Sequence, residues 1–248
     1  MRIQVTLTVA EGKRLIAKAV ATMDVVRTAL KNGLVVIAKG TTNAYVVEEI
    51  LSTTIDRRSY RSGVFTPQTP DRDPGLGPIP DMPDIVLRDG RPLQGLDRFT
   101  AAPELKRGDV YIKGANAVDS EHKLAGIFVG DPKGGTIGAV LGHIVGKKVN
   151  LVVPVGLEKR VCGNLAELAR RTNSGQTGGW GILPVAGEIV TEIEAVRILS
   201  GATASLVGAG GIAGAEGCVC LLIEGEDESV EKASTIMDSV KGEPRLVL

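Results

Sequence analysis

The stretch GLVVIAKGTTNAYVVEEIL, residues 33–51, contains a complete change of secondary structure. Residues 33–38 are a short apolar run, which is typical of a strand in a parallel sheet that is covered on both faces. Residues 39–43 (KGTTN) are turn-forming types, and residues 44–51 fit a short helix. A buried strand that passes through a glycine-bearing turn into a helix is the repeating unit of an open α/β sheet.

The same rhythm extends in both directions from this stretch. Residues 1–9 alternate polar and apolar side chains like a strand, and residues 11–31 carry apolar side chains at helical spacing. Further elements are predicted as strands at 109–112, 125–129 and 149–153 and as a helix at 136–145. We therefore expect residues 1–175 to form an α/β domain with an open, mostly parallel sheet and helices on both faces.

A long irregular segment, residues 56–83, interrupts this pattern and is rich in proline, including Pro67, Pro70 and Pro74. Loops of this length within a compact domain are usually functional or mobile. Its arginines Arg57, Arg58 and Arg61 either close over an acidic ligand or belong to a solvated loop. A β-hairpin turned on Asp89-Gly90 is predicted to follow it, because this dipeptide favours tight hairpin turns.

The last third of the chain has a different order of elements. Strands are predicted at 182–185, 202–207, 217–223 and 245–248, and helices at 188–199 and 228–240. The order β-α-β-β-α-β predicts a C-terminal ferredoxin-like α+β domain over residues 176–248. Trp180 lies at the predicted boundary, where it either docks the small domain on the large one or forms a wall of the ligand site.

The composition excludes several classes of partner. Twenty-nine basic and 29 acidic residues balance, so no uniform positive field is available to hold nucleic acid or a membrane surface. No apolar run is long enough for a membrane span, and residues 1–9 do not have the pattern of a signal peptide. The odd number of cysteines suits free thiols in a reducing compartment, and the spacing of Cys218 and Cys220 is too short for a zinc site. We expect a cytoplasmic protein without metal, nucleic-acid partner or membrane partner.

Three glycine-bearing turns follow predicted strands, at residues 39–43, 113–116 and 133–136, and each contains a lysine. In an open α/β sheet such turns gather at the carboxyl ends of the strands, where backbone N–H groups and helix N-termini favour an anion. If the three lysines converge, a bound anion would relieve their repulsion. The alternative is that these glycines only let the chain change direction.

The candidate residues follow from these turns. Predicted to bind the ligand are Lys39, Gly40, Thr41, Thr42, Asn43, Gly114, Asp119, Gly134, Gly135 and Thr136. Predicted to carry any catalysis are Lys113, Asn116 and Lys133. A lysine whose pKa is lowered by its neighbours could act as a base or as a Schiff-base amine.

The turns resemble those of the superfamily that contains ribose-5-phosphate isomerase type A, glucosamine-6-phosphate deaminase and the CoA transferases. In the isomerase a Gly-Thr-Gly-Ser-Thr loop binds the sugar phosphate, and the segment 38–42 (AKGTT) is similar to it. Residues 113–119 (KGANAVD) resemble the isomerase motif Asp-Gly-Ala-Asp-Glu-Val-Asp, and residues 133–136 (KGGT) its lysine–glycine loop. The resemblance covers roughly residues 13–160 and implies a sugar-phosphate type of ligand. Because Lys113 and Asn116 replace two acidic residues of the isomerase motif, true isomerase chemistry of that type is not expected.

The predicted function is therefore the binding of a small phosphorylated or carboxylated metabolite at the strand-to-helix turns, with isomerisation or group transfer as the reaction class left open. The alternative is a non-catalytic ligand sensor or an oligomeric assembly protein. A homo-oligomer is expected in either case, and no cofactor is predicted.

Overall fold

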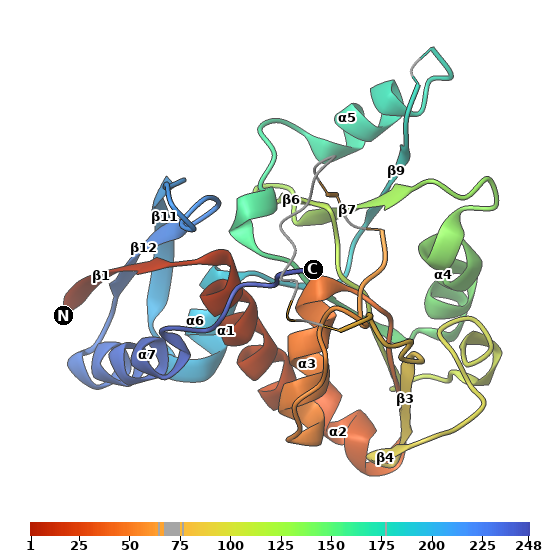
Figure 1. Cartoon of the computed structure of the whole chain (residues 1–248), viewed down its shortest axis with the longest axis horizontal. Helices are drawn as coiled ribbons and strands as arrows, with labels where there is room; N and C mark the ends of the chain where they lie inside the picture. Colours follow the sequence, from red (N-terminus) through yellow and green to blue (C-terminus); the bar gives the residue numbers. More distant parts are fainter. Residues whose placement is uncertain (64, 67–74, 76, 177) are drawn as a thin grey trace.

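The computed structural model describes residues 1–63, 65, 66, 75, 77–176 and 178–248, and within these residues it is a mixed α/β structure with three sheets (Figure 1). The loop predicted at 56–83 is described only in part, since Pro67, Pro70 and Pro74 lie outside the described residues. None of the helices within the described ranges combines the length and the apolar character needed to cross a membrane.

The central sheet has six strands in the order β10-β8-β5-β2-β3-β4. Four of them run parallel, namely β2 (Leu34–Ile37), β5 (Val110–Ile112), β8 (Asn150–Pro154) and β10 (Glu188–Val190). The antiparallel hairpin of β3 (Ile85–Arg88) and β4 (Arg91–Pro92) completes it, and Asp89 and Gly90 both have positive φ, as a tight hairpin turn requires. The predicted mostly parallel sheet and the predicted hairpin are confirmed.

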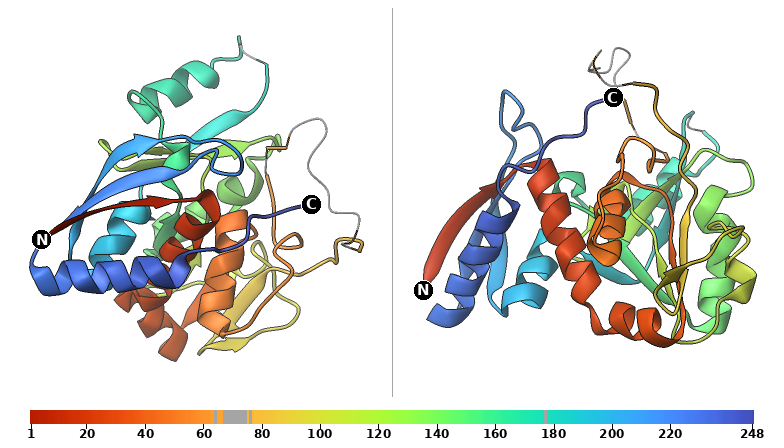
Figure 2. Two further views of the ribbon diagram at one scale, coloured as in Figure 1. Left: turned by 60° about the vertical axis from the view of Figure 1, so that its left-hand side comes forward. Right: turned by 60° about the horizontal axis from the view of Figure 1, so that its bottom comes forward.

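Both faces of this sheet are buried, which explains why the strands are continuously apolar. Val35 and Ile37 of β2 pack on one face with α1 (Val9–Thr22) and α3 (Thr41–Leu51). Leu34 and Val36 pack on the other face with α4 (Gly135–Lys147). The helices therefore lie on both faces of the sheet, as predicted, and the two layers are visible in Figure 2.

The helix predicted over residues 11–31 is two helices, α1 and α2 (Asp24–Asn32). Met23 separates them with an extended backbone at ψ 135°, and its N–H still bonds the carbonyl of Val20. A capping box formed by Thr8 and Glu11 begins α1. Both helices turn apolar side chains toward the same core, so the apolar periodicity of the sequence continues across the break.

The predicted ferredoxin-like domain at 176–248 is not confirmed. Of its predicted strands, β9 (Gly181–Val185) pairs with β7 (Leu124–Val129) in a separate sheet, and β7 pairs in turn with β6 (Ala117–Asp119). Residues 188–190, predicted to be helical, form β10 of the central sheet, and residues 245–248 form no strand. Long-range pairing of this kind is decided by packing, which local periodicity does not report.

The remaining sheet joins the two ends of the chain. The N-terminal strand β1 (Arg2–Leu7) pairs antiparallel with β12 (Val219–Glu224), which pairs with β11 (Thr203–Ala209). Helices α6 (Glu192–Ser200) and α7 (Asp227–Val240) pack against this sheet, while α5 (Leu165–Thr172) packs on β9. Short 3₁₀ turns occupy Ala102–Glu104 and Leu157–Lys159.

The segment after α7 reaches the centre of the molecule. Gly242 N donates to Glu11 Oε1 at 2.9 Å, and Lys241 Nζ donates to the carbonyl of Thr6. From there the chain crosses α1 to the N-terminal end of α3, where Leu246 and Leu248 line a cavity (Figures 1 and 2).

Candidate functional site

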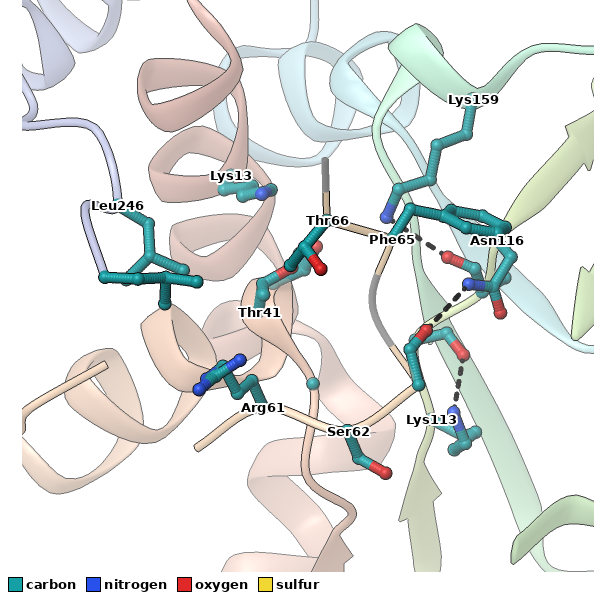
Figure 3. A pocket seen from close by; sticks show the side chains of 16 residues that line it. Lys13, Thr41, Arg61, Ser62, Phe65, Thr66, Lys113, Asn116, Lys159 and Leu246 are labelled. Atoms are coloured by element: carbon teal, nitrogen blue, oxygen red, sulfur yellow. Dashed lines mark hydrogen bonds between the residues drawn. The ribbon is translucent and has the colours of Figure 1, made fainter. Parts of the chain in front are cut away.

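A cavity of about 490 Å³ opens at the carboxyl ends of β2 and β5, where α3 begins (Figure 3). This edge of the sheet is where ligands bind in open α/β folds, and the volume lies in the range of small-molecule sites. The lining combines segments that are far apart in the sequence: α1, the turns at 40–42 and 113–116, residues 61–63, 65 and 66, Lys159, and the C-terminal leucines.

The first turn of α3 presents unused hydrogen-bond donors to this cavity. The residue before the helix is Gly40, which has no side chain to cap it, and its own N–H donates to the carbonyl of Tyr60 at 2.9 Å. In the described part of the chain, the N–H groups of Thr41, Thr42 and Asn43 have no hydrogen-bond partner. Free N–H groups and the positive end of the helix dipole together favour an anion.

Asn43 lies fully buried beneath the cavity and joins the two central strands. Its Nδ2 donates to the carbonyls of Ala38 at 2.7 Å and Ile112 at 3.3 Å, which are the ends of β2 and β5. Its Oδ1 is buried and has no partner among the described residues, and a Cβ placed on Gly114 would lie 3.9 Å from it. Asn43 thus holds the two glycine turns together, and its free acceptor lies beside Gly114, which lines the cavity.

Four cationic side chains line the cavity: Lys13, Arg61, Lys113 and Lys159. No Asp or Glu is among the described lining residues. Outside the lining, Glu158 Oε1 lies 3.9 Å from Lys159 Nζ. Excess positive charge in a partly enclosed space is unfavourable until an anion enters.

Burial and neighbouring positive charge lower the pKa values of two of these lysines. Burial, followed by the charge of Lys159, lowers the pKa of Lys13 to about 8, against the opposing influence of Glu158 and Glu192. Burial also lowers the pKa of Lys113 to about 8, and the charges of Lys159 and Arg98 act in the same direction. The charge of Lys159 therefore influences both other lysines, and all three residues line the cavity.

The rim is positioned by a buried tyrosine. The Tyr60 hydroxyl donates to the carbonyl of Ile37 and accepts from Ile85 N at 3.0 Å. The chain then passes over the cavity, where Asn116 Nδ2 donates to the carbonyl of Gly63 at 3.2 Å. Asn116 Oδ1 accepts from Phe128 N at 3.1 Å, so both polar atoms of this amide serve to hold the rim.

An aromatic cluster borders one end of the cavity. Phe65 lines the cavity and lies 4.8 Å from Trp180 and 5.5 Å from Phe128, measured between ring centroids. Trp180 is the only tryptophan in the sequence and is 46% exposed. It stands behind Phe65 and is not itself among the lining residues.

The structure brings together only some of the residues predicted from the sequence. Six of them line the cavity, namely Gly40, Thr41, Thr42, Lys113, Gly114 and Asn116, and Asn43 lies directly beneath it. Lys39 lines a neighbouring hollow and its Nζ lies 3.5 Å from Asp81 Oδ1. Lys39, Lys113 and Lys133 therefore do not line one cavity, contrary to the prediction. The cavity is lined by Lys113 together with Lys13 and Lys159.

The third predicted turn lies apart from the cavity, at the start of α4. Lys133 is exposed, Gly134 and Gly135 have positive φ, and Thr136 Oγ1 accepts from Arg98 Nε at 3.2 Å. Arg98 is itself fixed by two hydrogen bonds to the buried Asp84. Through Arg98, this turn is connected to Asp84, which directly precedes β3 of the central sheet, so its role is structural.

Asp119, predicted to orient a ligand, is a buried structural residue. Its carboxylate accepts from the backbone N–H groups of Glu121, His122 and Leu165 and lies 2.9 Å from His122 Nδ1. Burial raises the pKa of this carboxyl, but the hydrogen bonds outweigh burial and the pKa is lowered. Asp119 thus holds the turn between β6 and β7 and the start of α5.

The residues that sequence analysis missed have no local motif. Lys13 lies within an amphipathic helix, where a lysine is expected on the solvated face. Lys159 follows a strand at a distance of several residues, and Leu246 and Leu248 were expected in a strand. Of the loop arginines that the structure describes, only Arg61 lines the cavity, since Arg57 pairs with Glu48 and Arg58 with Asp56.

Comparison with known proteins gives no relative from which a function could be transferred: no protein-family model, curated protein or solved structure matches the chain.

Proposed function

We propose that this protein binds a small phosphorylated or carboxylated metabolite in the cavity at the N-terminus of α3. The observation that carries the proposal is that Lys13, Lys113 and Lys159 line one cavity whose described lining includes no Asp or Glu side chain. Three neighbouring ammonium groups repel one another, and a dianion between them converts that repulsion into attraction.

Hydrogen-bond donors support the same ligand class. The free N–H groups of Thr41, Thr42 and Asn43 surround the point where the dipole of α3 is positive. Four residues that carry hydroxyl groups also line the cavity: Thr41, Thr42, Ser62 and Thr66. A phosphate has enough acceptor oxygens to use several of these donors at once, as in other phosphate sites at helix N-termini.

Thermal unfolding with and without pyrophosphate, glycerol 3-phosphate and citrate tests the proposal. A ligand present at about one hundred times its dissociation constant stabilises the folded state by about 2.7 kcal/mol. For a chain of this length, that raises the melting temperature by roughly 5–10 °C. The substitutions Lys13→Met and Lys159→Met should each weaken binding severalfold or more, whereas the matched control Lys133→Met should leave it unchanged.

The alternative function, sensing without turnover, predicts the same stabilisation. A failure of all these anions to raise the melting temperature contradicts the proposal, as does a shift that Lys133→Met removes while Lys13→Met and Lys159→Met leave it intact. Catalysis is distinguished from sensing by the chemistry of Lys113.

A further inference from the structure

Lys113 differs from the other lysines of the cavity in its charged neighbours. Lys159 has a carboxylate of Glu158 at 3.9 Å, and Lys13 lies within the influence of Glu158 and Glu192. The charged groups that act on Lys113 are Lys159 and Arg98, and both are cations. In the described part of the chain no carboxylate pairs with its ammonium group.

The position of Lys113 also suits a reacting group. It follows directly after β5, at the carboxyl end of the central sheet, and its side chain lines the cavity (Figure 3). Its Nζ donates one hydrogen bond, to the carbonyl of Gly114 at 3.0 Å. This bond fixes the amine and, in the neutral form, uses a hydrogen while leaving the nitrogen lone pair free.

Burial and neighbouring positive charge are the two conditions that activate a lysine amine as a nucleophile. Both lower the pKa of Lys113, to about 8, so that a sizeable fraction is neutral near pH 7.5. A lysine with an ordinary pKa has only about one amine in a thousand neutral at that pH.

We propose that Lys113 is a catalytic residue whose amine forms a Schiff base with the carbonyl carbon of an anionic aldehyde or ketone held in the cavity. The proposal rests on the proposed function, because the anion-binding groups hold this substrate in place. It names the substrate class: a small carbonyl compound that also carries a phosphate or carboxylate.

The step balances without an oxidant or a reductant. The lone pair of the Lys113 amine attacks the carbonyl carbon, a C–N bond forms, and the carbonyl π electrons move to oxygen. That oxygen takes one proton from the neighbouring Lys159 ammonium and one from the nitrogen, the C–O bond breaks, and water leaves. The resulting iminium withdraws electrons from the adjacent carbon, which favours loss of a proton there.

Reductive trapping tests the inference. The protein is incubated at pH 7.5 with sodium cyanoborohydride and dihydroxyacetone phosphate, glyceraldehyde 3-phosphate or pyruvate, and the modified lysine is located by peptide mass mapping. We expect one adduct per chain, at Lys113, exceeding modification of Lys133 by at least about tenfold. Glycerol 3-phosphate, which lacks the carbonyl, should bind without forming an adduct and should compete with trapping.

The variant Lys113→Arg keeps the positive charge and removes the reactive amine. We expect it to be stabilised by glycerol 3-phosphate but to give no specific adduct. Adducts spread over exposed lysines, a main adduct at Lys13 or Lys159, or no adduct from any of the three carbonyl probes overturns the inference. If glycerol 3-phosphate still raises the melting temperature in that case, anion binding stands and only the Schiff base fails; if no anion does, both fail.

Discussion

At the scale of single residues, the cavity depends on lysines whose charge is easily lost. Lys13 and Lys113 lose a proton near pH 8 because burial and neighbouring cations disfavour their charged forms. An anion in the cavity favours those charged forms. Ligand binding therefore raises both pKa values, and binding takes up protons when the pH is close to 8.

The sign of the resulting pH dependence is fixed. Well below pH 8, near pH 6.5, both lysines are charged in the free protein and affinity is at its highest. As the pH rises through 8, the free protein loses charge that the complex retains, so affinity falls by up to about tenfold per lysine per pH unit. Titrations with sulfate, whose charge is constant over this range, should show the dissociation constant rising between pH 7.5 and pH 9.5.

The variant Lys13→Met is the control for this experiment. It should bind sulfate more weakly at neutral pH and show a shallower pH dependence, because one of the two titrating groups is gone. A dissociation constant that stays the same from pH 6.5 to pH 9.5 in the unaltered protein contradicts the assignment of these lysines to the site.

Local sequence was sufficient for the residues that the backbone itself places at the site. Gly40, Thr41 and Thr42 follow a buried strand and begin a helix, and this pattern is legible within a dozen residues. Lys13 could not be found in this way, since it reaches the cavity only because α1 packs beside α3. The sequence predicted the kind of charge at the site and one of the three lysines that supply it.

At the scale of secondary-structure elements, a buried carboxyl lies where α6 begins against α1. Glu192 is the first residue of α6, is 2% exposed, and accepts from Leu157 N at 2.9 Å. The two helices approach so closely that a Cβ on Gly12 would lie 2.5 Å from Glu192 Oε1. Burial, followed by the charge of Glu158, raises the pKa of Glu192 to about 7.

This raised pKa predicts how stability changes with pH. A carboxyl with a folded-state pKa near 7 and an unfolded value near 4.5 binds more protons in the folded state between those limits. Its contribution to the free energy of unfolding is therefore largest at low pH and is lost as the pH rises to 7, by up to about 3 kcal/mol. Replacement of Glu192 by Gln keeps the acceptor for Leu157 N and removes this loss.

Urea unfolding at pH 5 and pH 8 measures the effect. Between pH 5 and pH 8 the unfolding free energy of Glu192→Gln should increase relative to that of the unaltered protein. The exposed Glu231→Gln serves as control and should show no such change. Equal differences at both pH values would mean that Glu192 is ionised throughout, contrary to its burial.

Elements with strong periodicity were predictable, and their partners were not. The continuous apolar runs of β2, β5 and β8 follow from burial on both faces of the sheet, which is a local consequence of the fold class. The pairing of β1 with β12 joins residues more than two hundred positions apart, and no pattern within either strand specifies it. For this reason the sequence predicted that a strand at residues 245–248 would complete the C-terminal sheet, whereas in the structure β1 pairs with β12 there.

At the scale of the whole molecule, an ion-pair network ties the C-terminal segment to the helices beside the cavity. Arg14 of α1 pairs with Glu48 of α3 and with Glu243, at 2.5 and 2.8 Å. Arg57 also pairs with Glu48 and Glu243, and both arginines lie over the ring of Tyr45. Glu243 thus fixes the segment that carries Leu246 and Leu248 to the cavity.

Removal of the Glu243 charge takes away a carboxylate that Arg14 and Arg57 share. Breaking fully buried pairs costs about 3–5 kcal/mol, and partial exposure reduces this to about 2 kcal/mol here. Glu243→Gln should therefore lower the melting temperature by roughly 4–8 °C, as measured by calorimetry. Glu231→Gln on the exposed side of α7 should lower it by less than about 1 °C. Equal effects of the two substitutions would show that the network contributes nothing.

Diffraction from crystals soaked in tungstate, an anion with strong anomalous scattering, shows whether three lysines and the start of α3 form one anion site. We expect the main anomalous peak inside the cavity, within hydrogen-bond distance of Lys13, Lys113 or Lys159 and of the N–H groups of Thr41 and Thr42. An empty cavity, with the peaks at exposed lysines such as Lys133, would contradict it.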